Sequence, residues 1–116
     1  MASTDCLFCN IIAGSIPAHK VYEDDHAVVF HDINPQAPVH YLAIPREHFS
    51  NIHDVPPEKA MILGSLFSAV KTVVDKENLA EKGYRLVINS GKSAGQAVFH
   101  IHVHILSGRT LTWPPG

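Results

Sequence analysis

Positive charge is scarce and scattered in this sequence. The 116 residues include 9 Lys or Arg against 11 Asp or Glu, a formal net charge of −2, and no stretch gathers the cations together. Proteins that hold DNA or long RNA neutralise the phosphates with basic stripes, so a nucleic-acid polymer is excluded as the expected partner. A single nucleotide has few phosphates to hold and needs no such stripe.

Long hydrophobic runs and cysteine-rich segments are also missing. No apolar segment approaches the roughly 20 residues that a helix needs to cross a bilayer, and residues 1–5 (MASTD) lack the basic segment that begins a secretory signal. Two cysteines, Cys6 and Cys9, are too few for a disulfide scaffold. We therefore expect a soluble intracellular chain, cytoplasmic or nuclear, with no membrane partner.

What the sequence does contain is one domain's worth of chain and an excess of histidine. A chain of 116 residues, 46% of them hydrophobic, can form one compact core. We expect a single domain over residues 1–116, small enough that dimerisation would help to stabilise it. The nine histidines equal Lys and Arg combined. A surface does not need that many, so their positions carry information.

Hydrophobic periodicity predicts an α+β fold. Apolar residues spaced by three and four between positions 57 and 79 indicate one long helix, whose apolar stripe comprises Leu63, Leu66, Phe67, Val70, Val73 and Val74. The compact apolar segment 6–13 predicts a short N-terminal helix. Runs rich in β-branched and aromatic residues predict five strands, at 21–23, 27–30, 39–45, 84–89 and 98–106. We expect a five-stranded antiparallel meander with the long helix on one face.

Three of the histidines alternate with branched aliphatic residues in the segment FHIHVHIL near the C-terminus. Successive side chains of a strand point to opposite faces, so His100, His102 and His104 share one face while residues 101, 103 and 105 pack into the core. A register shift of one residue would bury all three imidazoles, so the core determines the face that they occupy.

Three interpretations of this histidine face are open on the residues alone. A merely solvated face is the least favoured, because Thr, Lys, Ser or Glu would serve there equally well. Two neighbouring imidazoles can instead bind one zinc ion with a further ligand from elsewhere. Alternatively, an imidazole nitrogen is nucleophilic at neutral pH. The middle residue, His102, would then have a donor on either side to stabilise a phosphate under attack.

The glycine-containing segment 91–96 (GKSAGQ) directly precedes the histidines. Glycines allow backbone N–H groups to approach a phosphate closely. Most such segments are ordinary loops, so this one points to a phosphate only because the histidine face lies beside it.

The run GQAVFHIHVHIL closely resembles the signature of the histidine-triad (HIT) superfamily, His-φ-His-φ-His-φ-φ with φ apolar. The ending WPPG resembles the tail of its Hint branch, the purine nucleoside phosphoramidases. The upstream segments FCNIIAGSIPA, YEDD, FHDINPQAPVH, AIPREH and YRLVIN fit the same branch in the same order. The resemblance therefore covers nearly the whole chain.

The resemblance implies a homodimer whose protomers join their sheets into one, with each active site facing outward. It implies hydrolysis of adenosine and other purine nucleoside 5′-monophosphoramidates at the P–N bond, with no cofactor for the chemistry. His102 would attack the α-phosphorus and form a nucleotidyl-histidine that water then cleaves. His100, His104 and the upstream His40 would lie around the phosphate.

A nucleotide site follows from the same resemblance, formed by Phe30, Asp32, Ile33, Asn89, Gly95, Gln96, Ala97, His102, His104 and Trp113. Asp32 matches the carboxylate that accepts from both ribose hydroxyls, while Phe30 and Ile33 would line the base pocket. A simpler explanation of Asp32 is a turn residue before the proline-bracketed loop 34–38.

The phosphate side of that site carries one departure from the family pattern. Asn89, Gly95 and Gln96 match phosphate-side residues, and Trp113 resembles a residue that reaches the neighbouring protomer's site. Many Hint enzymes carry a serine after the Gly-Gln pair, where this chain has Ala97. Ala97 offers only its backbone N–H, so assistance to the leaving group is reduced. Asn89 and Trp113 also have plain alternatives, as a strand end and as packing of a tail.

The two cysteines have the spacing of half a zinc site. Some proteins that this chain resembles bind zinc through two such cysteines, the histidine of an I-P-x-x-H segment and the first triad histidine. Those positions are Cys6, Cys9, His48 and His100, so a structural zinc ion is expected. His100 would then be committed to the metal. The alternative is a pair of small buried thiols.

Other functions remain as alternatives to a phosphoramidase. A dinucleoside polyphosphate hydrolase of the sister Fhit branch is disfavoured by the WPPG ending and the short single domain. A non-catalytic nucleotide sensor or scaffold would keep the pocket but has no need of His102. A bare metal-binding module would use the cysteines and histidines without nucleotide chemistry.

Overall fold

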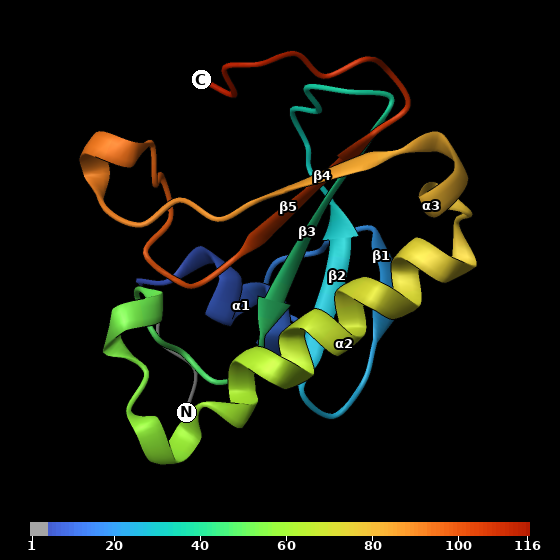
Figure 1. Ribbon diagram of the computed structural model, residues 1–116. Helices are drawn as coiled ribbons and strands as arrows, with labels where there is room; N and C mark the ends of the chain where they lie inside the picture. The colour runs from blue at the N-terminus through green and yellow to red at the C-terminus, as the bar shows by residue number, and fades with distance from the viewer. Residues whose placement is uncertain (1–4) are drawn as a thin grey trace.

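The computed structural model describes residues 5–116; residues 1–4, on which part of the expectation about a secretory signal rested, lie outside the described residues. The described chain forms these helices and strands (Figure 1): α1 Leu7–Ala13, β1 Lys20–Glu23, β2 Ala27–His31, β3 Val39–Pro45, α2 Met61–Lys76, α3 Leu79–Lys82, β4 Tyr84–Val87 and β5 Val103–Ser107. Short 3-10 turns lie at Ile52–Asp54, Pro57–Lys59 and Lys92–Ala94.

The five strands form one antiparallel sheet in the order β1-β2-β3-β5-β4. The antiparallel sheet, the long helix and the short N-terminal helix confirm the predicted fold class. The predicted meander is right for β1 to β3 and wrong beyond them, because β5 lies between β3 and β4. The chain leaves β3 through α2 and returns at the edge of the sheet as β4, which leaves the place beside β3 for β5.

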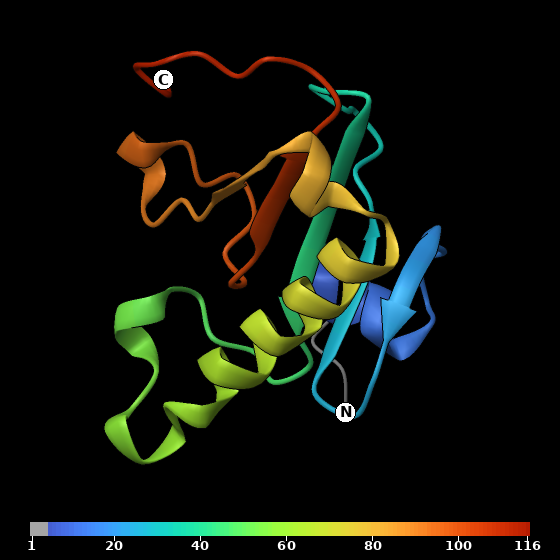
Figure 2. The same ribbon diagram turned by 45° about the vertical axis from the view of Figure 1, so that its right-hand side comes forward.

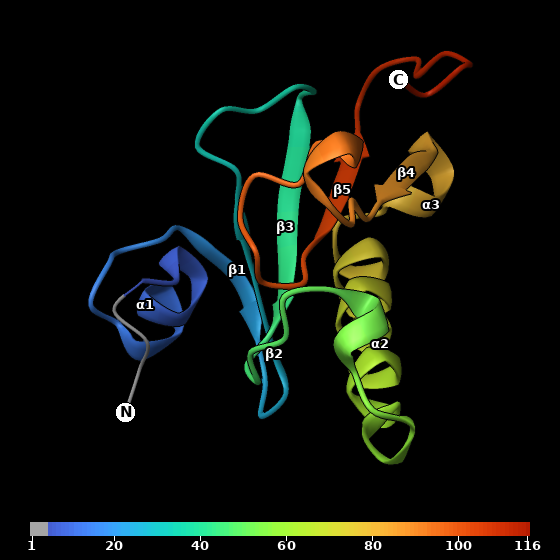
Figure 3. The ribbon, with the colours of Figure 1, turned by 90° about the vertical axis from the view of Figure 1, so that its left-hand side faces the viewer.

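Helices cover both faces of the sheet. In Figure 2 α2 runs along one face, and in Figure 3 α1 lies on the opposite side of the strands. The core beneath α2 includes residues 66, 69, 70, 73 and 74, and the second core lies around Phe8 and Ile11 of α1. Phe67, which the helical spacing placed in the buried stripe, is instead 40% exposed, and Ala69 takes a buried position.

The residues between the histidines alternate as predicted. Ile101, Val103 and Ile105 are buried in the core on the α2 side, so the histidines face the α1 side. Regular pairing begins only at Val103, later than the predicted strand over 98–106. Ahead of β5 the chain is attached by other bonds, such as that from the Ile101 amide to the Phe49 carbonyl at 2.9 Å.

In the described part of the chain, no helix combines the length and apolarity that a membrane crossing requires.

Candidate active site and metal centre

His102 is buried and held in one tautomer by the backbone beside it. Its Nδ1 lies 2.8 Å from the carbonyl oxygen of His100. A carbonyl only accepts, so Nδ1 carries the proton and donates it, and the lone pair resides on Nε2. The edge-to-face ring of Phe8, 5.1 Å away between centroids, fixes the imidazole plane. The neutral ring of this residue thus presents an oriented nitrogen lone pair.

His102 lines a mostly apolar pocket of about 590 Å³ on the α1 side of the sheet. The predicted nucleotide residues that line it are Phe30, Asp32, Ile33, Ala97, His102 and His104. The remainder of the wall is contributed chiefly by apolar residues of α1 and the segment that follows it: Leu7, Phe8, Ile11, Ile16, Pro17 and Ala18. Its volume and lining are typical of a small-molecule site with a few polar groups at one end.

The proton on His104 is set by a chain of bonds that begins at a backbone amide. The Gln36 N–H donates to His40 Nδ1 over 3.0 Å, so the neutral His40 ring has its proton on Nε2. That Nε2 lies 2.9 Å from His104 Nδ1 and donates to it. His104 therefore carries its own proton on Nε2, which makes it a hydrogen-bond donor in the pocket.

Burial keeps this pair of imidazoles neutral. Desolvation, assisted by the neighbouring His102 and His40, lowers the pKa of His104 from 6.5 to about 4. Desolvation also lowers the pKa of His40, and the Asp32 carboxylate opposes part of that shift. At neutral pH both rings are uncharged, as the single-proton chain requires.

Asp32 forms a turn and also lines the pocket. Its Oδ1 accepts the Asn34 N–H at 2.8 Å, which makes a turn at the start of the proline loop. Its Oδ2 lies 3.4 Å from His40 Nε2, and the residue also lines the pocket. The turn fixes the carboxylate, and the remaining acceptor capacity of its oxygens is directed at the site.

Gln96 shapes the neighbouring loop. Its Oε1 accepts the Gly91 N–H at 2.7 Å, and its Nε2 donates to the carbonyls of Ser50 and Val98. The side-chain amide is thereby engaged inside the protein. Gly91 and Gly95 both adopt positive φ, a conformation that disfavours a side chain. A Cβ on Gly95 would also lie 4.0 Å from Asn89 Nδ2, so the loop packs directly on the predicted phosphate-side residue.

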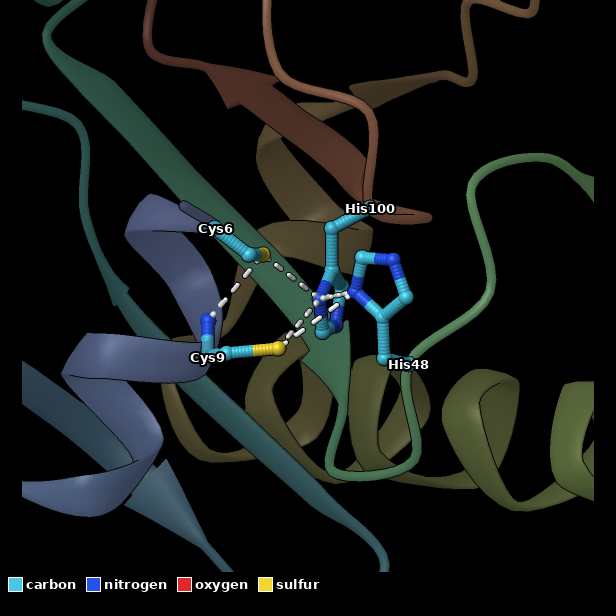
Figure 4. A group of neighbouring side chains, drawn as sticks. All are labelled: Cys6, Cys9, His48 and His100. Atoms are coloured by element: carbon cyan, nitrogen blue, oxygen red, sulfur yellow. Dashed lines mark hydrogen bonds between the residues drawn. The ribbon is translucent and has the colours of Figure 1, made fainter. Parts of the chain in front are cut away.

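The predicted metal ligands converge from three segments (Figure 4). Their ligand atoms all lie within 4.8 Å of one another: Cys6, Cys9, His48 and His100. His100 Nδ1 is 3.0 Å from His48 Nδ1 and 3.3 Å from Cys6 Sγ. Cys9 Sγ is 3.4 Å from His48 Nδ1. Ligand atoms of a tetrahedral zinc ion lie roughly 3.3–3.8 Å apart, given its usual bond lengths, so the donor set fits zinc.

The second nitrogen of His100 supports the same conclusion. Its Nε2 lies 2.9 Å from the Pro45 carbonyl, to which it donates. The Nδ1 lone pair is therefore free to ligate, in the arrangement that metal-binding histidines ordinarily have. With both nitrogens engaged and the side chain fully buried, the ring is turned away from the pocket. The expectation that it donates to a phosphate does not fit this geometry; its carbonyl serves the site instead.

A second cluster with metal-ligating residue types lies at the pocket, formed by Asp32, His40 and His104. Its tautomers are wrong for a metal. His40 Nδ1 is occupied by the Gln36 N–H, so the nitrogen facing the cluster bears a proton and has no lone pair to give. This cluster is a hydrogen-bond chain.

Four of the predicted nucleotide residues are not among those that line the pocket in a single chain: Asn89, Gly95, Gln96 and Trp113. Trp113 is 81% exposed on the C-terminal tail, whereas Ile33 lines the pocket and is completely exposed. Conversely, residue patterns missed the parts that orient the histidines: the carbonyl of Pro45, the amide of Gln36 and the ring of Phe8. Backbone groups leave no trace in residue identity, and Phe8 reads simply as a core residue of α1.

Comparisons with known proteins identify one family over most of the chain. The HIT domain matches residues 13–111. An uncharacterized HIT-like protein of Synechococcus elongatus is 48% identical over 114 residues, which cover 98% of this chain and 99% of the relative. A second uncharacterized HIT-like protein, from Synechocystis, is 46% identical and covers 97% of each chain.

Solved structures show the same relationship. A HIT family hydrolase from Legionella pneumophila Philadelphia 1 superposes with a TM-score of 0.92 and 47% identity, covering 97% of this chain and 100% of that one. A histidine triad nucleotide-binding protein from Candida albicans gives a TM-score of 0.81 and 33% identity, covering 95% and 83%. With its oriented histidines, its nucleotide-sized pocket and these matches over nearly its whole length, the chain belongs to the HIT family.

Proposed function

We propose that this protein is a Hint-type nucleoside phosphoramidase, which hydrolyses the P–N bond of purine nucleoside 5′-monophosphoramidates through a covalent histidine intermediate. The observation that carries this proposal is His102: its Nδ1 proton is bonded to the His100 carbonyl, so Nε2 is free in a pocket large enough for a nucleotide. The names of two relatives, a HIT family hydrolase and a histidine triad nucleotide-binding protein, support it.

In the first step the His102 Nε2 lone pair attacks phosphorus, an Nε2–P bond forms and the bond to the amine breaks. The imidazole becomes cationic, and the His100 carbonyl accepts its Nδ1 proton more strongly as that charge develops. The His104 Nε2–H donates to a phosphate oxygen, where negative charge is stabilised in phosphoryl transfer. The departing amine takes a proton from water, because Ala97 has no hydroxyl to supply one.

In the second step water attacks the phosphorus of the nucleotidyl-histidine. The Nε2–P bond breaks, its electron pair returns to Nε2, and the nucleoside monophosphate leaves with the water oxygen. The proton that this water loses goes to solvent and balances the one that the amine took in the first step. The free enzyme is regenerated, with no cofactor used. Two successive displacements divide one difficult substitution into two easier ones.

The test is a His102→Ala variant assayed on an adenosine phosphoramidate and on a diadenosine polyphosphate. We expect the wild type to prefer the phosphoramidate and the variant to lose turnover by at least about 10³-fold, the usual scale for removing a covalent nucleophile, while it still binds AMP. Substrate with a chiral phosphorus should give net retention of configuration, and quenched wild type should carry a nucleotide adduct on His102.

Different results would revise the proposal in defined ways. Turnover by His102→Ala, or inversion at phosphorus, would rule out the covalent mechanism. Preference for the diadenosine substrate would transfer the protein to the dinucleoside polyphosphate hydrolases. Tight AMP binding without any turnover by the wild type would make it a nucleotide sensor.

We also propose that the cluster of Cys6, Cys9, His48 and His100 holds a structural zinc ion. The contacts between ligand atoms, at 3.0–3.7 Å, are close to the spacing of a tetrahedral site, and the two imidazole nitrogens at 3.0 Å need to separate only slightly to admit the ion. When bound, zinc would tie α1 and the segment after β3 to the chain just before β5. It would thereby fix the His100 carbonyl that orients His102.

A homodimer is the third part of the proposal. β4 is an edge strand of the sheet, and exposed apolar side chains lie on it and on α2, among them Tyr84 and Phe67. Joining two copies through this edge would cover both and bring Trp113 to the partner's pocket. Sedimentation should give twice the chain mass. His102→Ala protein can also be mixed with Trp113→Ala protein so that heterodimers form. The activity of the mixture should differ from the average of the two variants only if the tail of one protomer acts on the pocket of the other.

A further inference from the structure

A surface arginine on the C-terminal segment is attached to the hydrogen-bond chain of the active site. Arg109 donates from both Nε and Nη2 to the carbonyl of Gln36, each at 3.1 Å. Gln36 is the residue whose own amide N–H sets the proton on His40. The guanidinium of Arg109 therefore holds the backbone of Gln36 by two hydrogen bonds, a pair that we call the Arg109 fork. Gln36 is the residue at which the hydrogen-bond chain to His104 starts.

The same contact is prepared by the residue before the arginine. Gly108 has a φ of +96°, and a Cβ placed there would lie 2.8 Å from Pro38 Cβ. The segment after β5 can approach the 32–38 loop this closely only without a side chain at that position. Figures 1 and 2 show the two segments passing one another above the sheet. Gly108 thus allows the approach, and Arg109 anchors it.

We propose that Arg109 is a positioning residue for the phosphate donor: by holding the Gln36 carbonyl, it keeps the Gln36 amide on His40 and the His104 Nε2 proton directed into the pocket. The loop that carries Gln36 is closed by prolines and is exposed, with no regular strand pairing over residues 32–38. Without the fork, residue 36 can rotate, and His40 loses the amide that occupies its Nδ1. The Asp32 carboxylate, 3.4 Å from Nε2, is then the remaining group that favours the Nε2–H tautomer. His104 then divides between two tautomers, only one of which can donate to phosphate.

The catalytic consequence rests on the proposed function, whereas the tautomer consequence does not. Two bonds from an exposed guanidinium are weakened by water, so the expected effect is modest. For Arg109→Ala we expect kcat to fall about fivefold with KM nearly unchanged. A donor that acts on the phosphate as charge develops affects the rate more than substrate binding.

The test joins kinetics to ¹⁵N NMR of the histidine rings at pH 7.5, where the chemical shifts of the two nitrogens distinguish the tautomers. Wild type should show His40 and His104 protonated on Nε2. In Arg109→Ala the His104 signals should shift toward a mixture, and Arg109→Lys, which keeps one donor, should lie between the two. The matched control is Arg85→Ala, because Arg85 also donates to the C-terminal tail, at the Thr112 carbonyl, but not to Gln36.

Each result decides the matter. Altered His104 tautomers in Arg109→Ala but not in Arg85→Ala support the positioning role, even if the wild type hydrolyses no phosphoramidate. Unaltered tautomers in Arg109→Ala overturn it, whatever happens to the rate. Equal changes in both variants also overturn it, because the effect would then come from the tail in general.

Discussion

Two histidines stand at equal distance along the chain from His102, and the protein uses them in opposite ways. His100 turns its Nδ1 lone pair toward two cysteines and His48. His104 directs an Nε2 proton into the pocket, because His40 donates to its other nitrogen. The residue types are identical and both side chains lie on the α1 side of the sheet.

The difference comes from the backbone group that bonds to each set of histidines, a carbonyl in one case and an amide in the other. The Pro45 carbonyl accepts from His100 and frees a lone pair for a metal. The Gln36 amide donates to His40 and turns that group into a chain of protons. A histidine becomes a ligand or a donor according to the partner of its second nitrogen. We call the group around His100 the metal side and the group around His104 the donor side. If the two are independent, a change on one side should leave the other unaltered.

The largest expected effect concerns the metal side. Purified protein should contain about one zinc ion per chain. Cys9→Ser should remove it and lower the free energy of unfolding by at least about 3 kcal/mol, a fall in Tm on the order of 15 °C. The physical reason is that a bound zinc ion would tie three segments together in the folded state alone. Metal analysis and thermal unfolding, with and without chelator, measure both quantities.

The exposed His53, which is not part of the cluster, provides the control. His53→Asn should keep its zinc and its Tm. The prediction is contradicted if folded wild type contains no metal after expression with added zinc and its Tm is the same with and without chelator. The cluster would then consist of thiols and imidazoles that bind no ion.

The next effect is a loss of stability in acid on the donor side. The folded-state pKa of His104 is about 4 against 6.5 for the unfolded chain. Between these values the unfolded state binds more protons, so stability is present above pH 6.5 and is lost as the pH falls toward 4. The shift corresponds to about 3 kcal/mol. Urea unfolding at pH 7 and pH 4.5 measures it.

Acid also releases zinc from thiolates, so the comparison must be with His104→Asn. In that variant the free energy of unfolding should depend less on pH, because the contribution of His104 is missing. Its zinc content should equal that of the wild type. Parallel pH curves for the two proteins would mean that His104 is not held neutral by burial.

A third effect separates the two sides by activity. His40→Ala removes the ring that donates to His104, and we expect kcat to fall about 30-fold, equivalent to about 2 kcal/mol for one hydrogen bond to a group that develops charge. His40→Gln keeps a donor at a similar position and should restore part of the rate. Zinc content should be unchanged in both. Zinc loss in His40→Ala would show that the two sides are coupled.

How much of this arrangement the sequence predicted differs between the two sides. The grouping of Cys6, Cys9, His48 and His100 was predicted residue by residue, because thiols and imidazoles are recognisable from their identity as possible metal ligands. The binding of zinc stays a prediction. The alternation through Ile101 and Val103 was also predicted, since burial follows residue type.

The donor side was predicted only as a set of neighbouring residues. Nothing in the identity of Gln36 shows that its amide would select the tautomer of His40, because every residue except proline has that amide. The same limit applies to the place of β5 beside β3: the pattern of strands predicts pairing but not which strand fills the gap left by a crossover. Likewise, Phe67 follows the helical spacing but is 40% exposed, because spacing defines a stripe on a helix and not how much of that stripe a neighbouring element covers.

The smallest effect is at Ala97, which lines the pocket between the two sides. Ala97→Ser would add a hydroxyl that can donate to a phosphate oxygen or to the leaving nitrogen. One such bond is worth about 1 kcal/mol, so we expect kcat to rise about fivefold with amines that leave poorly and hardly at all with those that leave well. A series of phosphoramidates with amines of graded basicity measures this. The dependence of rate on amine basicity should become shallower in Ala97→Ser, with Ala97→Gly as the variant that adds no donor. An equal gain for every amine would place the new hydroxyl on the phosphate, beside His104, and would leave the departing nitrogen to water in both proteins.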